Sequence, residues 1–131
     1  MDYKDIDKVI ESQVKFVKDN SNSVSNRIQI LNSLLISIKH NESRIYEALK
    51  QDLNKHEFES FLSEILLVKK EIKLFVRKLR SWSKKKRVSG SILNFPSQNY
   101  LIPEPYGNVL IITPWNYPFQ LSISPLIGAV A

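Results

Sequence analysis

The side chains best suited to chemistry stand together near the carboxyl end of the chain. Trp115, Asn116 and Tyr117 lie between two prolines and follow an apolar run, NVLIIT, at residues 108–113. Such a run is typical of a strand buried on both faces of a parallel sheet. Ligands bind at the carboxyl ends of strands in these sheets, so the position favours a binding site. The alternative is structural, with Asn116 stabilising a turn and Trp115 in the core, and spacing alone favours it.

Other side chains that commonly carry chemistry are absent or isolated. The sequence has no cysteine, which excludes a thiolate nucleophile, a thiolate metal site and disulfides within these residues. His40 and His56 are the two histidines, and neither has a second histidine four residues away, as a helical zinc pair requires. We interpret both as exposed residues at helix ends and expect no metal site. The three glycines are too far apart for a glycine-rich phosphate loop.

Four glutamates could suggest paired carboxylates for acid–base chemistry. They are Glu57, Glu59, Glu64 and Glu71. All four fall within the longest amphipathic pattern of the chain. We therefore interpret them as members of the solvated face of a helix.

The elements that must position these residues fall into a first part without glycine or proline and a last part that contains all three Gly and all six Pro, after Ser89. Apolar residues at three- and four-residue steps predict helices around residues 6–17, 28–38 and 45–53, with a polar connection at 19–26 and Asn41 as a cap. A longer stripe predicts a fourth helix that ends near Trp82 and needs a further partner surface, in a bundle rather than a coiled coil. The stripe consists of Phe58, Phe61, Ile65, Val68, Ile72, Phe75 and Leu79.

The last third of the chain has a composition that does not predict continuous helix. Residues 87–102 mix apolar residues with Ser, Gly, Asn and Pro, which predicts short extended pieces joined by turns. A strand at 108–113, a loop and a helix from Phe119 onward follow, with Pro125 as a difficulty for that helix. We therefore expect an α/β chain with three parts: amphipathic helices at 1–86, an extended or hairpin connection at 87–106, and the opening of a parallel sheet at 107–131.

Composition and charge narrow the classes of protein further. With 131 residues, 43% of them hydrophobic and 24% charged, the chain fits one globular domain or part of one. The net charge of +6 comes from residues 69–87, which contain ten Lys or Arg and one Glu. We interpret this stretch as a solvated helix face; a module that binds nucleic acid or an anionic membrane is the alternative. Acidic first residues and the lack of a long apolar run indicate a cytoplasmic protein.

Residues 104–131, EPYGNVLIITPWNYPFQLSISPLIGAVA, closely resemble the segment that opens the cofactor-binding domain of aldehyde dehydrogenases, in particular the class 3-like, NAD(P)-dependent branch. Residues 41–72, with Trp82 and 84–88, resemble the N-terminal helices of that branch. The resemblance implies helices that lead into the first strand and helix of an incomplete Rossmann-like parallel sheet. It also implies oxidation of aldehydes to carboxylates with NAD or NADP by a homodimer. We expect no nucleic acid as a partner and no membrane contact from this portion of the chain.

The resemblance also implies roles for individual residues. Asn116 matches the asparagine whose amide N–H stabilises the oxyanion that forms from the aldehyde. Tyr117 lies where the family lines its aldehyde tunnel. The residues that match the lining of the cofactor pocket are Ile112, Thr113, Pro114 and Trp115. The nucleophilic cysteine and the general-base glutamate of the family have no counterpart here, so we expect the chain alone to be inactive; a truncated interaction partner is a further alternative.

Overall fold

The computed structural model describes residues 3–19 and 23–131. Its first part is helical, as the apolar periodicity predicts. The helices are α1 (Tyr3–Asp19), α2 (Val24–His40), α3 (Glu42–Leu53) and α4 (Glu57–Ser60), which continues through a π-helical turn, η1 (Phe61–Ile65), into α5 (Leu66–Trp82). Of the predicted connection at 19–26, residues 20–22 lie outside the described residues and 24–26 already belong to α2.

Asn41 stands between α2 and α3, where the sequence predicts a cap. Its side chain makes no capping bond to α3. The Asn41 amide instead donates to the carbonyl oxygen of Ser37 in the preceding helix, at 2.9 Å. Asn41 therefore closes α2 more than it opens α3.

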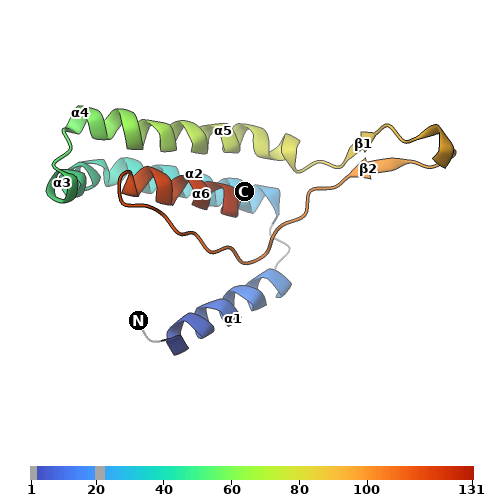
Figure 1. Ribbon diagram of the computed structural model, residues 1–131, viewed down its shortest axis with the longest axis horizontal. Coiled ribbons are helices and arrows are strands. Elements are labelled where there is room, and N and C mark those ends of the chain that lie inside the picture. Colours follow the sequence, from blue (N-terminus) through green and yellow to red (C-terminus); the bar gives the residue numbers. More distant parts are fainter. Residues whose placement is uncertain (1–2, 20–22) are drawn as a thin grey trace.

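The core lies where α2, α5 and α6 (Pro118–Val130) pack side by side (Figure 1). Its buried residues are Leu31, Leu35, Ile38, Val68, Ile72, Leu79 and Ile127. Three of them belong to the long apolar stripe, so α2 and α6 supply the partner surface that this stripe requires. Phe58, at the start of the stripe, is an exception because its side chain is 66% exposed.

Helix α1 lies apart from this bundle (Figure 1). The apolar residues of its stripe, among them Ile6, Val9 and Ile10, are 42–47% exposed. A hydrogen bond from the Asn108 side chain to the Ile10 carbonyl oxygen, at 3.4 Å, connects it with the rest of the chain. The amphipathic pattern thus correctly predicts a helix here, but the described residues do not bury its apolar face.

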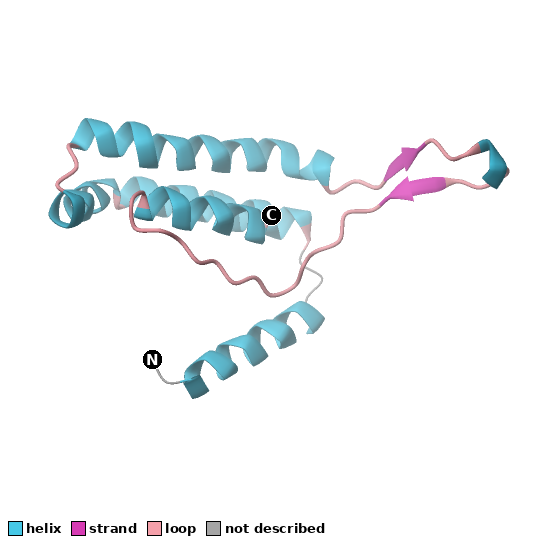
Figure 2. Cartoon of the chain, in the orientation of Figure 1, coloured by secondary structure: helices cyan, strands magenta, loops and turns pink. Residues whose placement is uncertain are grey.

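A hairpin projects from the end of the bundle (Figure 2). Strands β1 (Lys86–Val88) and β2 (Asn99–Leu101) pair antiparallel, with Lys86 opposite Leu101, and a short 3₁₀ turn, η2 (Ile92–Asn94), forms the tip. The short extended pieces predicted for this region are confirmed. The tip carries Ile92, Leu93 and Phe95, each at least 85% exposed.

The prediction of a strand at residues 108–113 is wrong. They form no strand, and Leu110 and Ile112 are 83% and 85% exposed. A strand needs a neighbour that takes up its N–H and C=O groups, and the described residues offer this segment no such neighbour. The helix that follows is confirmed and continues through Pro125, because the apolar contacts of its other residues with the core offset the hydrogen bond that proline cannot donate.

The boundaries proposed at residues 86 and 106 remain predictions. Within the described ranges, α6 shares one core with α2 and α5. No helix in these ranges is both long enough and apolar enough to cross a membrane.

Candidate functional site

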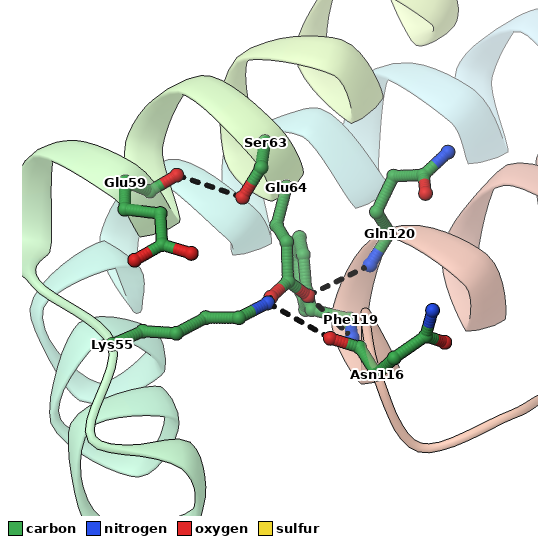
Figure 3. Close-up of polar contacts among 7 residues, drawn as sticks. All are labelled: Lys55, Glu59, Ser63, Glu64, Asn116, Phe119 and Gln120. Atoms are coloured by element: carbon green, nitrogen blue, oxygen red, sulfur yellow. Dashed lines mark hydrogen bonds and ion pairs between the residues drawn. The ribbon is translucent and has the colours of Figure 1, made fainter.

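Asn116 stands at the amino end of α6, on a loop that the fold presents to solvent. Its side chain is exposed, and its carboxamide makes no hydrogen bond within the described residues. Figure 3 shows this carboxamide directed away from Lys55. Trp115 beside it is 87% exposed. The structural alternative, with Trp115 in the core and Asn116 bonded in a turn, is therefore wrong, and the amide is available to a ligand.

Two buried charges lie behind this loop. Lys55 is 8% exposed and Glu64 is fully buried, and the Lys55 Nζ lies 2.5 Å from the Glu64 Oε1. The burial of Glu64 corrects the interpretation that all four glutamates lie on a solvated helix face. Spacing is compatible with this burial, because Glu64 lies three residues after Phe61 and four before Val68, on the same helix face; Glu64 and Ile65 are both buried within η1.

Glu64 supplies the cap that α6 lacks. Tyr117 at the N-cap position makes no side-chain capping bond, and Pro118 has no N–H. The next two amides would be left without partners at a helix start. The Glu64 Oε2 accepts both, from the backbone N–H of Phe119 at 2.9 Å and of Gln120 at 3.3 Å (Figure 3). A carboxylate in this position is also favoured by the helix dipole.

Lys55 holds the residues just before the helix. Its ammonium group donates to the backbone carbonyl oxygen of Asn116 at 3.0 Å (Figure 3). The same group lies 4.1 Å from the centre of the Tyr117 ring, within cation–π distance. Lys55 thus contacts the backbone of the predicted catalytic residue and the side chain of the predicted substrate residue. Sequence reasoning missed this role, because nothing in the pattern around Lys55 marks it as buried.

The predicted cofactor residues form the extended segment before Asn116. Ile112 and Trp115 expose 85% and 87% of their side chains, and the Thr113 hydroxyl lies 3.2 Å from the Ser122 hydroxyl on α6. Apolar surface of this kind fits the ring of a nicotinamide. The given sequence contains no glycine-rich turn of the kind that cradles a pyrophosphate.

The two histidines take structural positions. His40 lies in the last turn of α2, with its Nδ1 3.0 Å from the Ile36 carbonyl oxygen. His56 caps α4 by accepting from the Phe58 N–H at 3.2 Å. Both are exposed, which confirms the interpretation as helix-end residues. In residues 3–19 and 23–131, no three His, Asp or Glu side chains come together as a metal site would require.

The basic stretch lies mainly on the outer face of α5 and on β1. Exposed members include Lys70, Lys73 and Arg77. Lys69 instead pairs with Glu42 on α3, at 2.5 Å, and Lys85 lies 3.8 Å from the centre of the Tyr100 ring. The interpretation as a solvated helix face is confirmed for α5.

Comparisons with known proteins identify relatives of this chain. The 4,4'-diaponeurosporen-aldehyde dehydrogenase of Staphylococcus aureus is 43% identical over 124 residues, which cover 95% of this chain and 27% of that protein. Aldehyde dehydrogenase family 3 member B1 of Rattus norvegicus is 39% identical over 125 residues, again 95% of this chain and 27% of that protein. The chain thus spans about a quarter of the length of these relatives.

A solved structure of the substrate-bound state of Staphylococcus aureus AldH superposes with a TM-score of 0.91 at 40% identity, over 99% of this chain and 28% of that chain. This similarity confirms the fold class: the chain adopts the N-terminal part of the aldehyde dehydrogenase fold. The model of the aldehyde dehydrogenase family matches residues 1–131. The chain therefore belongs to the aldehyde dehydrogenase family.

Proposed function

We propose that the chain forms the amino-terminal part of an NAD(P)-dependent aldehyde dehydrogenase that oxidises aldehydes to carboxylates. The observation that carries the proposal is the exposed and unbonded carboxamide of Asn116, on a backbone that buried charges hold. The family match over the whole chain supports the reaction class.

In this reaction the Asn116 side chain stabilises the negative charge that develops on the aldehyde oxygen. When a nucleophile adds to the aldehyde carbon, negative charge develops on the carbonyl oxygen. The amide N–H of Asn116 donates a hydrogen bond to that oxygen, which lowers the barrier by about 3 kcal/mol for a preorganised donor. The nucleophile comes from outside these residues, because they include no cysteine.

The neighbouring residues shape the site. NAD or NADP, when bound, would supply the acceptor for the hydride. Ile112, Pro114 and Trp115 would hold its nicotinamide ring through apolar contact, and the Thr113 hydroxyl lies 3.2 Å from the Ser122 hydroxyl. Tyr117, 38% exposed beside Asn116, lines the path of the aldehyde. The complete enzyme acts as a homodimer, a proposal that the exposed apolar tip of the hairpin supports.

The test is Asn116→Ala in the complete enzyme, with hydride transfer followed by the absorbance of NADH or NADPH. We expect kcat to fall by about 10²- to 10³-fold, the usual effect of removing one oxyanion donor. The temperature of unfolding should stay close to that of the wild type, because the deleted carboxamide is exposed and unbonded.

Asn32→Ala is the matched control, since Asn32 is an exposed asparagine on α2, away from the site and from the hairpin tip. Its kcat should equal that of the wild type. Turnover of Asn116→Ala at the level of this control would remove Asn116 from the reaction.

A further inference from the structure

Lys55 and Glu64 are the two charged residues that are buried in the part of the chain that the structure describes. Burial of charges is unfavourable unless their attraction and additional hydrogen bonds offset the loss of water. A pair that only connected two helices could lie at the surface, as Lys69 and Glu42 do, with side chains 16% and 24% exposed. The buried pair therefore calls for an explanation beyond the attraction of its two charges.

The remaining bonds of this pair all go to one short segment. Glu64 accepts from the amides of Phe119 and Gln120, and Lys55 donates to the carbonyl oxygen of Asn116. The carboxylate fixes the first turn of α6, and the ammonium fixes the peptide just before it. The bonds thus hold residues 116–120 from both sides of Pro118.

These bonds fix the backbone that carries the Asn116 side chain. They hold the backbone on which the carboxamide stands and leave the carboxamide itself unbonded within the described residues (Figure 3). A donor for a developing oxyanion must be held in place before the reaction, and misplacement of a reacting group by about 1 Å can lower the rate about 10²-fold.

We propose that Lys55 and Glu64 are positioning residues for the reaction and act through Asn116. This inference rests on the role proposed above for Asn116. The pair makes no contact with the aldehyde; it orients the loop that carries the oxyanion donor.

The first experiment compares Glu64→Gln and Lys55→Met in the complete enzyme with a control pair, Glu42→Gln and Lys69→Met. The control removes an ion pair of the same 2.5 Å length elsewhere in the helices. We expect kcat to fall about 10- to 100-fold at Lys55 or Glu64, with the KM for the aldehyde changed less than threefold, and to stay within about twofold in the controls.

The second experiment separates positioning from general stability. In the Asn116→Ala background there is no carboxamide to position, so Glu64→Gln should lower kcat by less than about threefold further. Lys55→Arg, which keeps both charges, should recover part of the kcat lost in Lys55→Met. If Glu64→Gln does not fold, the kcat of Lys55→Met is compared in the wild-type and Asn116→Ala backgrounds instead. Lys55→Arg then serves as the variant that keeps the charge.

The outcomes distinguish the two proposals. Equal losses of kcat from Glu64→Gln in both backgrounds would show that the pair acts independently of Asn116 and would overturn this inference. Wild-type turnover in a folded Glu64→Gln or Lys55→Met variant would overturn it as well. If Asn116→Ala itself had no effect, the proposed function of Asn116 would fail first, and this inference with it.

Discussion

Single side chains on α3 show how local contacts set ionisation. Lys69 donates to Glu42 at 2.5 Å, and the Tyr46 hydroxyl donates to the same carboxylate at 2.8 Å. The hydrogen bond from Lys69 lowers the pKa of Glu42 from its ordinary value. Burial, followed by the hydrogen bond to Glu42, raises the pKa of Tyr46 to about 12. Both shifts favour the states in which the two hydrogen bonds exist.

This cluster predicts a late step in the alkaline titration of the folded chain. The raised pKa of Tyr46 means that its contribution to stability is complete below pH 10 and is lost as the pH rises towards 12. Absorbance of tyrosinate near 295 nm should therefore include one component with a midpoint near pH 12. The substitution Tyr46→Phe should remove this component.

Tyr106→Phe provides the control, because Tyr106 is 99% exposed. This variant should keep the late step. A Tyr46→Phe titration identical to that of the wild type, with circular dichroism showing a folded chain, would contradict the assignment.

The same cluster predicts how the free energy of unfolding changes as the pH falls. Because the pKa of Glu42 is lowered in the folded state, its contribution is present above the ordinary pKa of a glutamate and is lost as the pH falls through the folded value. Glu42 is partly exposed, so solvent screens this contribution and it stays small.

At the scale of elements, α5 connects the site with the core. Its residues Val68, Ile72 and Leu79 are buried against α2 and α6, and η1 at its start directs Glu64 towards α6. One continuous helical rod thus supports both the bundle and the loop of Asn116. Any loss of packing along α5 should also loosen the amino end of α6.

Ile72→Ala tests this support. Ile72 is fully buried, so its truncation should lower the free energy of unfolding by about 2–5 kcal/mol. Leu67 on the same helix is 45% exposed, and Leu67→Ala should have a much smaller effect. Urea denaturation followed by circular dichroism measures both; equal losses would place Ile72 outside the core.

The helices and strands also show which features of the fold can be predicted from the sequence. Apolar periodicity predicts α5 well, because a regular helix buries every third or fourth residue. It fails at Glu64, because a charged side chain is expected in solvent and the sequence does not show that Lys55 pairs with it in the interior. It fails again at residues 108–113, where composition reports the tendency to form a strand but pairing depends on a neighbour elsewhere. The motif predicts Asn116 as a candidate site residue, whereas the contacts of Lys55 become visible only in the three-dimensional structure.

At the scale of the whole molecule, the described residues expose apolar surface at several places besides the stripe of α1. The hairpin tip exposes Ile92, Leu93 and Phe95, and the segment 108–113 runs unpaired over the surface. Apolar patches and unpaired backbone promote association with other chains. The isolated chain should therefore associate with itself.

The variant Leu93→Ser with Phe95→Ser tests the contribution of the tip. Light scattering of the chain should decrease, because two side chains that are 90% and 85% exposed lose their apolar surface. The free energy of unfolding should change by no more than about 0.5 kcal/mol per substitution, as is usual for surface positions. Unchanged scattering would exclude the tip and assign the association to other exposed apolar surface, such as the segment 108–113 or the stripe of α1.

The cap that Glu64 provides to α6 has a consequence for synthesis on the ribosome. Glu64 is translated 55 residues before Phe119, whose backbone N–H donates a hydrogen bond to the Glu64 carboxylate. It is translated nine residues after Lys55. At about 5–20 residues per second, translation separates Glu64 from α6 by roughly 3–11 s. Lys55 and Glu64 are thus both made before α6, and the helix meets an acceptor supplied by residues translated earlier.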